Sequence, residues 1–400
     1  MKKFFKIFMS VLLAAVSAVN ISFFAFAEKN DNSESGDSSA LPVKIAAKSA
    51  ILCEVTSGKV LMEYNADEKL YPASVTKIMT VLLTVEALGS GKISLTDKVA
   101  CSKNAASKGG SQIWLEEGEE MTVDELLKAT VIGSANDAAT LLGEYVSGSE
   151  EAFIARMNER AAELSMTNTH FENATGLDDT TDTHKTTARD IAIMSCELLK
   201  HDIIRNYSTV WMDSLRDGAT ELVNTNKLVR FFSGTTGLKT GTTAKAGCCV
   251  SASCERDGLH LVAVVMGSDN SSDRFETAKA MLSWGFSNYA VVTPEVDMSL
   301  ITDVKIIGGE KSAVTPKVPE IKSILVKKGD EGKLKQEVEL ALDAEAPVVS
   351  GQKLGSITFT LEGEAVAKYD IVSDCEVKKL TFFTALKRIA AFLKCGALPQ

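Results

Sequence analysis

The spacing of apolar residues changes several times along this chain, and the order of those changes limits the folds that it can adopt. Residues 48–67 alternate apolar and polar side chains around Ser57-Gly58, which predicts a β-hairpin. Helical spacing then occupies five segments, at residues 74–88, 121–132, 134–148, 149–166 and 186–200. Strand spacing returns at residues 240–254 and 259–266, and a helix at residues 271–289 follows. This order predicts an α+β domain whose last helix packs back on the sheet.

Local signals mark where several of these elements begin and turn. Thr122 and Glu125 have the spacing of a capping box, in which each side chain accepts a backbone N–H group of the other. Ser149 and Thr187 are capping residues followed by acids in the first helical turn, where negative charge is favourable. Asp257-Gly258 favours a tight turn, so the two strands that it joins are expected to pair antiparallel.

Beyond residue 292 the pattern changes to six to eight short alternating segments between Gly, Pro and Asp turns. This pattern predicts a small all-β, sandwich-like domain. The final segment is helical and amphipathic, with three basic residues and no acid, and is too short and too charged to span a bilayer. We expect it to lie on a membrane surface, and packing on its own domain or on a partner is the alternative. Its apolar face consists of Phe382, Phe383, Leu386, Ile389, Ala390 and Leu393.

The first residues combine three lysines with an apolar run that ends in Ala25-Phe26-Ala27. This is the pattern of a secretory signal peptide cleaved after Ala27, and an uncleaved membrane anchor is the alternative. Both interpretations predict that the rest of the chain is exported. The expected organisation is a signal peptide at 1–27, a flexible spacer at 28–42, the α+β domain at 43–290, the β domain at 291–380 and the amphipathic helix at 381–400.

Charge and composition exclude other classes of function. A net charge of −10 argues against nucleic-acid binding, which requires clustered basic residues. The eight cysteines are scattered, several of them in apolar runs where cysteine acts as a small hydrophobic residue, so we expect no obligatory disulfide. No Cys or His spacing resembles a zinc site, and we expect neither a metal nor a cofactor.

A serine and a lysine stand three apart where an apolar helix begins, at Ser74 and Lys77 in "YPASVTKIMT". Residues at this spacing share a helix face, so the lysine amine can reach the serine hydroxyl. A partly desolvated lysine can act as the base that activates a serine nucleophile. A capping serine beside a surface lysine is the alternative. The same spacing occurs at Ser350 and Lys353, in a predicted turn, where we interpret it as structural.

Two further short motifs favour the catalytic interpretation. Ser134 and Asn136 in "SAN" stand where another helix begins, so both side chains can project into a cleft. Lys239, Thr240 and Gly241 form "KTG" at a strand edge, where the lysine and threonine can bind an anionic group and the glycine lets a substrate backbone approach. The ordered set of Ser-x-x-Lys, Ser-x-Asn and Lys-Thr-Gly is much more specific than any one motif.

With these motifs the chain resembles the low-molecular-mass penicillin-binding proteins, which are serine-type D-alanyl-D-alanine carboxypeptidases of peptidase family S11. The resemblance covers about residues 40 to 380 and includes "GSANDAA", "NATGL", "NTNKL", "GLKTGTTAKAGCC" and "DRFETAKAMLSWGF". It implies a β-lactamase/transpeptidase-like fold for the α+β domain. It also implies that peptidoglycan stem peptides are the substrates and that β-lactam antibiotics are covalent inhibitors. One departure from relatives is the pair Cys248 and Cys249, a difference that concerns fine substrate preference and not the chemistry.

The resemblance also assigns roles to residues. It implies that Ser74 is the acylated nucleophile, Lys77 its base and Ser134 a proton relay to the leaving amine. Asn136 lines the cleft, and the backbone N–H groups of Ser74 and Thr242 form the oxyanion hole. The residues expected to bind substrate are Asn136, Lys239, Thr240, Gly241, Thr242 and Arg274.

Three other functions use related architectures. A class A β-lactamase shares the motifs, but the Glu-x-x-Leu-Asn loop that such enzymes use for deacylation is absent from this sequence. A D,D-endopeptidase that cuts crosslinks remains open. A catalytically silent peptidoglycan-binding protein is expected to lack Ser74 or Lys77, and both are present. We therefore predict an exported carboxypeptidase that acts at the outer face of the cytoplasmic membrane.

Overall fold

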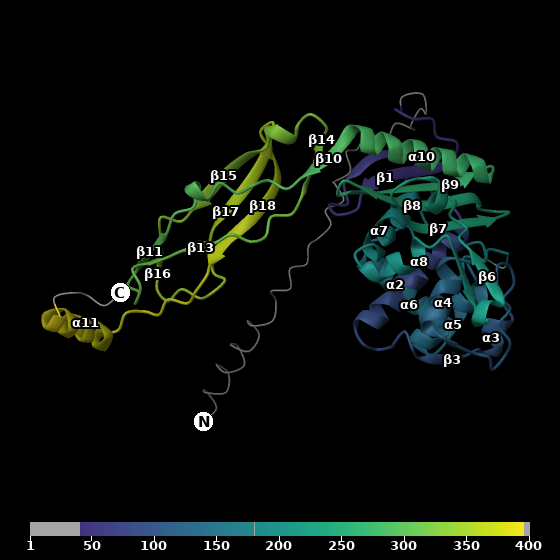
Figure 1. The fold of residues 1–400 in the computed structure, drawn as a ribbon, viewed down its shortest axis with the longest axis horizontal. Coiled ribbons are helices and arrows are strands. Elements are labelled where there is room, and N and C mark those ends of the chain that lie inside the picture. Colours follow the sequence, from purple (N-terminus) through teal and green to yellow (C-terminus); the bar gives the residue numbers. More distant parts are fainter. Residues whose placement is uncertain (1–40, 180, 396–400) are drawn as a thin grey trace.

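The computed structural model describes residues 41–179 and 181–395, with side chains described to residue 390. The predicted signal peptide at 1–27 and nearly all of the predicted spacer at 28–42 lie outside the described residues. Figure 1 shows one body of helices around a sheet, a second, elongated body of strands, and a terminal helix at the far end of the second body.

The first body is built on a five-stranded antiparallel sheet with the strand order β2-β1-β9-β8-β7. Its strands are β1 (Ser49–Glu54), β2 (Val60–Tyr64), β7 (Thr235–Thr243), β8 (Gly247–Arg256) and β9 (Leu259–Ser268). The hairpin predicted at 48–67 and the antiparallel pairing across Asp257-Gly258 are confirmed. Strand β7 stands at an edge of the sheet, so one side of its backbone is not paired with another strand of that sheet.

The single strand predicted at residues 240–254 is wrong, because the structure has two strands there. Strands β7 and β8 pair antiparallel and are joined by a tight turn at residues 244–246. Gly247, which opens β8, has a φ of 67°, a left-handed conformation that glycine adopts without steric cost. Ala244 and Ala246, on either side of Lys245, continue the alternation of apolar and polar residues through the turn. The alternation alone therefore did not reveal that the chain reverses here.

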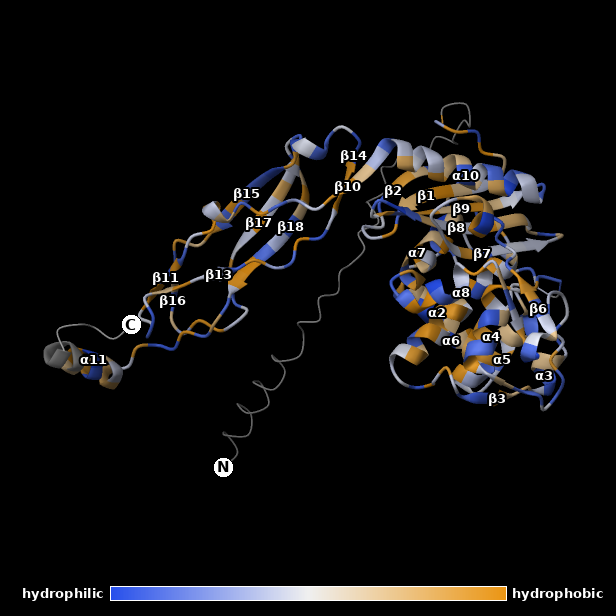
Figure 2. Cartoon of the chain, in the orientation of Figure 1, coloured by the Kyte–Doolittle hydropathy of each residue, from blue (hydrophilic) through white to orange (hydrophobic). Residues whose placement is uncertain are grey.

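The sheet separates two hydrophobic cores. In β1, Ile51 and Cys53 face a large core shared with the helices, whereas Ala50 and Leu52 face a smaller core under helix α10 (Ser271–Asn288). Strand β9 divides in the same way and is buried along its whole length. Figure 2 shows β1 coloured mainly as apolar, as expected for a strand covered on both faces. As predicted, the last helix of this body packs back on the sheet.

The helices of the first body cover the other face of the sheet in Figure 1. They are α2 (Lys77–Gly89), α3 (Lys103–Ala106), α4 (Val123–Val131), α5 (Asn136–Ser147), α6 (Glu150–Glu163), α7 (Ala188–Leu198) and α8 (Arg205–Ser208). The short helix α9 (Leu228–Phe231) lies on the α10 side, where Leu228 packs in the smaller core. Two short strand pairs lie among them: β3 (Lys98–Ala100) with β4 (Glu120–Thr122), and β5 (Met212–Leu215) with β6 (Thr220–Val223).

Most predicted caps form as expected. Thr122 and Glu125 make the reciprocal capping box, and the side chains of Ser149 and Thr187 accept backbone N–H groups of α6 and α7. Helix α5 differs, because it begins at Asn136 and not at Ser134, and no side chain caps it. Ser134 has a φ of 62°, so it turns the chain before the helix starts.

The second body is all-β and contains two small cores, as the predicted β domain requires. Its strands form the sheets β10-β14, β12-β11-β16 and β13-β18-β17-β15. They are β10 (Tyr289–Val292), β11 (Val304–Ile307), β12 (Ala313–Val314), β13 (Pro316–Lys317), β14 (Ile324–Lys327), β15 (Lys335–Leu340), β16 (Asp343–Glu345), β17 (Lys353–Leu361) and β18 (Glu364–Ser373). The second Ser-x-x-Lys lies in the turn before β17, and Lys353 forms an ion pair with Asp370 of β18.

Helix α11 (Phe382–Cys395) follows the strands. Its aromatic residues Phe382 and Phe383 and its aliphatic residues Leu386 and Ile389 are exposed to solvent. Within the described residues, no helix is both long and apolar enough to cross a bilayer. The seven cysteines at positions 53, 101, 196, 248, 249, 254 and 375 are free thiols, and all except Cys375 are buried.

Candidate active site

Ser74 lies in a short 3₁₀ turn, Ala73–Thr76, that leads directly into α2. Ala73 adopts a left-handed φ of 48°, which marks a sharp change of chain direction just before the serine. The Ser74 side chain caps neither the turn nor the helix. Its hydroxyl instead lies 2.9 Å from Lys77 Nζ, which donates to it. The cap interpretation of Ser74 is therefore wrong, because the hydroxyl faces the lysine and not the backbone N–H groups.

Lys77 is completely buried and has three hydrogen-bond acceptors. Besides Ser74 Oγ, its Nζ donates to Asn136 Oδ1 at 2.6 Å and to the backbone carbonyl of Thr175 at 3.1 Å. Burial lowers the pKa of Lys77 well below its usual value, and the nearby charge of Lys239 lowers it further, although Asp137 opposes both. The site thus favours a neutral amine one hydrogen bond away from a serine hydroxyl.

Asn136 is the first residue of α5, and hydrogen bonds hold both its side chain and its backbone. Its side-chain Nδ2 donates to the carbonyl of Gly109 at 2.6 Å, and its backbone N–H donates to the carbonyl of Ser111 at 2.7 Å. These bonds leave Oδ1 directed at Lys77. Ser134, two residues earlier, is 4 % exposed at the same helix entrance.

The Lys-Thr-Gly motif lies on β7, the edge strand, and passes very close to Ser74. A Cβ atom at Gly241 would lie 2.7 Å from the Pro72 carbonyl oxygen and 2.8 Å from the Ser74 backbone nitrogen. Only glycine leaves room for this approach. Lys239 is buried on the same strand, and burial lowers its pKa to about 7, with a contribution from the charge of Arg274.

Arg274 reaches the same strand from α10. Its Nη1 donates to the Gly241 carbonyl at 2.9 Å, to Thr242 Oγ1 at 2.9 Å and to the Cys249 carbonyl at 3.2 Å. Burial lowers the pKa of this guanidinium. Its Nε is buried and has no hydrogen-bond partner among the described atoms. Arg274 therefore holds the end of β7 and orients the Thr242 hydroxyl, whose oxygen lies 3.9 Å from Cys248 Sγ.

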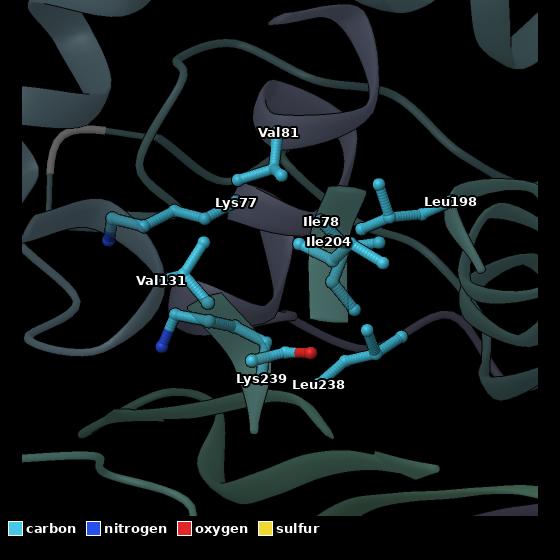
Figure 3. A pocket seen from close by; sticks show the side chains of 9 residues that line it. Lys77, Ile78, Val81, Val131, Leu198, Ile204, Leu238 and Lys239 are labelled. Atoms are coloured by element: carbon cyan, nitrogen blue, oxygen red, sulfur yellow. The ribbon is translucent and has the colours of Figure 1, made fainter. Parts of the chain in front are cut away.

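A small cavity of about 10 Å³ lies behind the two lysines. Figure 3 shows the aliphatic stems of Lys77 and Lys239 lining it with Val131 between them, while both amine nitrogens point away from Ile204 and Leu238 toward the same side. The apolar lining supplies the poorly solvated surroundings that disfavour charged amines. Both lysines are desolvated because they lie between the apolar side chains of the helices and strand β7 of the sheet.

Two buried contributors were not singled out from the sequence. The Thr175 carbonyl belongs to the segment 171–177, which is nearly a hundred residues from Lys77 in the chain. Asp137 accepts the backbone N–H groups of Ile113 and Leu115 and thereby holds the loop that contacts Asn136. The signals available for Asp137 were its place in "GSANDAA" and its acidic side chain inside an otherwise apolar, alanine-rich helix start. No group of three potential metal-ligating side chains occurs in the part of the chain that the structure describes.

Comparison with known proteins gives two family matches. Residues 35–270 match the peptidase S11 model, described as D-alanyl-D-alanine carboxypeptidase. Residues 295–379 match the C-terminal domain of penicillin-binding protein 5. The two matches cover the first body up to the start of α10 and the second body from residue 295 on, and α10 and β10 lie between them.

Individual proteins agree with these matches. The chain is 40% identical over 384 residues to D-alanyl-D-alanine carboxypeptidase DacF of Bacillus subtilis, covering 95% of this chain and 97% of the relative. The structure resembles penicillin-binding protein 5 of Haemophilus influenzae with a TM-score of 0.73 and 28% identity, covering 85% of this chain and 99% of the other. It also resembles penicillin-binding protein D2 of Listeria monocytogenes in its ampicillin-bound form, with a TM-score of 0.56 and 29% identity over 62% of this chain and 100% of the other.

Proposed function

The chain belongs to the D-alanyl-D-alanine carboxypeptidase family, peptidase S11, and from this membership we propose how its residues catalyse the reaction. The enzyme is a serine-type D-alanyl-D-alanine carboxypeptidase, a hydrolase of cell-wall synthesis. In our proposal Ser74 attacks the carbonyl between the two terminal D-alanines of a stem pentapeptide. The terminal D-alanine leaves, and water hydrolyses the acyl-enzyme to release the tetrapeptide.

The single observation that carries this proposal is the hydrogen-bonding environment of Lys77. Two of its three partners, Asn136 Oδ1 and the Thr175 carbonyl, are oxygens that only accept hydrogen bonds. When Lys77 is neutral, its two N–H groups satisfy these oxygens and its lone pair faces Ser74 Oγ. Lys77 is thus oriented as well as desolvated for removing the hydroxyl proton in the attack.

The remaining site residues bind the substrate and stabilise charge in this proposal. The Ser74 backbone N–H group, beside Gly241, and that of Thr242 form the oxyanion hole. The unpaired edge of β7 receives the peptide backbone, since an extended chain can add to such an edge. Lys239, Thr240, Thr242 and Arg274 attract the terminal carboxylate. Asn136 contacts a substrate amide, and Ser134 passes the proton from Lys77 to the leaving amine.

We propose that β-lactam antibiotics acylate the same serine. The likeness to a penicillin-binding protein in its ampicillin-bound form supports this, because the family fold accommodates such a ligand. The test is to incubate the protein with a fluorescent penicillin and with a diacyl-D-Ala-D-Ala peptide. We expect covalent labelling and release of D-alanine, both lost in Ser74→Ala. Labelling that survives this substitution, or a wild-type protein that releases no D-alanine, would defeat the assignment.

We further propose that the protein is exported and that α11 attaches it to the outer face of the cytoplasmic membrane. Four exposed apolar residues and the basic residues Lys387 and Arg388 lie on this one helix, a composition suited to an anionic membrane surface. Substituting Phe382 and Phe383 by glutamate is expected to abolish cosedimentation with anionic vesicles. Leu342→Glu is the matched control, because Leu342 is an exposed apolar residue outside the helix. Unchanged cosedimentation of the double variant would refute the attachment.

A further inference from the structure

The third acceptor of Lys77, the Thr175 carbonyl, belongs to the loop of residues 172–176. Contacts with other segments must hold this loop against α2. The loop residue Gly176 has a φ of 86°, and a Cβ there would overlap the Ala73 carbonyl, so the two segments are in direct contact. Thr80 Oγ1 donates to the Ala174 carbonyl at 2.7 Å. Asn173 Oδ1 accepts the N–H groups of Thr175 and Gly176 and so shapes the loop internally. The position of the Thr175 carbonyl therefore depends on how the loop is joined to the catalytic turn.

His184 makes the remaining link between the two segments. Its side chain is completely buried. The two residues that follow it form isolated β-bridges with other segments, Lys185 with His170 and Thr186 with Leu70. Its Nδ1 lies 3.0 Å from the backbone nitrogen of Glu172, and its Nε2 lies 2.9 Å from Thr76 Oγ1. One imidazole thus joins the loop to the residue that immediately precedes Lys77.

The hydrogen-bond partners define the tautomer of this histidine. A backbone N–H group can only donate, so Nδ1 accepts from Glu172, and Nε2 of the neutral ring carries the proton and donates to Thr76. Burial lowers the pKa of His184 to about 4, and the charge of His170 contributes. The carboxylate of Glu172 interacts instead with Thr183 and His170. The ring is therefore neutral at neutral pH, and the bridge is present there.

We propose that His184 is a positioning residue for acylation, because its ring fixes the 172–176 loop on the catalytic turn and thereby holds the Thr175 carbonyl on Lys77. The inference rests on the proposed roles of Ser74 and Lys77. His184 does not contact the reacting atoms. It acts by keeping one of the two acceptors that orient the Lys77 amine and by keeping water out of the space between the loop and α2.

Loss of the bridge has a defined chemical consequence. When the loop separates from α2, the Lys77 amine loses an orienting acceptor and gains water. The lost acceptor and the gained water have opposite effects on the pKa of Lys77. Burial is the main cause of its low pKa, so hydration wins and the pKa rises. The other charged groups that act on Lys77, Lys239 and Asp137, remain in place. Acylation should become slower and require a higher pH.

The experiment measures the second-order rate constant of acylation by a fluorescent penicillin as a function of pH. For His184→Ala we expect a decrease of about 10- to 100-fold, since small displacements of catalytic groups have effects of that order, and a shift of the ascending limb to higher pH. His184→Gln should recover part of the rate, because its amide can again donate to Thr76. His170→Ala, a change of an exposed histidine in the same loop region, is the matched control and should acylate as wild type.

A second variant guards against misfolding of the first. Thr76→Val keeps the packing volume and His184 but removes the hydroxyl that accepts from the ring. It should also slow acylation, and in combination with His184→Ala the two effects should not add, since both break one hydrogen bond. Folded variants that acylate at the wild-type rate, or that lose thermal stability with an unchanged pH profile, would overturn the proposal. That result leaves penicillin labelling of Ser74 intact, so it is distinct from a failure of the proposed function.

Discussion

Gly241→Ala tests the close approach of strand β7 to the turn that carries Ser74. The added Cβ would lie 2.7 Å from the Pro72 carbonyl oxygen, 2.8 Å from the Ser74 backbone nitrogen and 2.9 Å from Ala73 Cβ. Ordinary contact begins at 3.4 Å, so the turn and β7 must separate by about 0.7 Å, the shortfall at the Pro72 oxygen (3.4 Å less 2.7 Å). Gly241 does not have a positive φ, so alanine is tolerated by the backbone and the effect is purely steric.

This separation moves the groups on which the chemistry depends. The Ser74 nitrogen is an oxyanion donor in the proposed mechanism, and Ser74 Oγ moves with it. Overpacking of this kind costs about 1–3 kcal/mol of stability. The effect on catalysis should be larger, with acylation slowed by about 100-fold, because the reacting groups lose their alignment. The rate constant of penicillin acylation and thermal unfolding measure the two effects separately.

Gly89→Ala is the matched control. Gly89 ends α2, has no positive φ, and no atom lies within 4 Å of an added Cβ. It should leave acylation unchanged. If Gly241→Ala acylates as fast as Gly89→Ala in a folded protein, the close approach of β7 to Ser74 is not required, and the reasoning from its geometry is refuted.

Two further predictions concern the lysines. Lys239→Met should abolish D-alanine release yet stabilise the protein by about 1–3 kcal/mol at pH 7, because an ammonium is no longer buried. The folded-state pKa of Lys239 is about 7, below its unfolded value, so the unfolded chain binds more protons between these values and wild-type stability rises with pH through that window. Urea unfolding at pH 7 and pH 9.5 should show a smaller rise in the variant, and an equal rise would contradict this. Ser350→Ala with Lys353→Ala, at the second Ser-x-x-Lys, should leave labelling and D-alanine release unchanged, and any large loss would show that this turn is not merely structural.

The parts of the fold predicted from the sequence are those with local causes. The Thr122 capping box and the Asp257-Gly258 turn depend on side chains a few residues apart, and both form as predicted. The errors at the turn of residues 244–246 and at Ser134 have a different origin. In each case a residue with a left-handed φ, Gly247 or Ser134, changes the direction of the chain, and the apolar pattern does not show this.

The candidate site also combines features with local causes and features that depend on distant segments of the chain. The motifs supplied the residues of the proposed reacting centre, but the burial of Lys77 and its Thr175 acceptor depend on segments far away in the chain. The cap interpretation of Ser74 was also decided by tertiary structure. The Ser74 hydroxyl accepts a hydrogen bond from the Lys77 amine and does not cap the helix, because the 3₁₀ turn directs it away from the helix N–H groups.

The two cores separated by the sheet have a practical consequence for studying how this protein opens. Cys53, Cys101, Cys196 and Cys249 are buried in the core on the helical side, and Cys254 is buried in the core beneath α10. A buried thiol reacts with an alkylating reagent only when its surroundings open, so its reaction rate under native conditions reports a local unfolding free energy. The native sequence therefore carries reporters on both sides of the sheet. Peptide mass spectrometry of the alkylated protein can measure whether the two layers loosen together or one before the other.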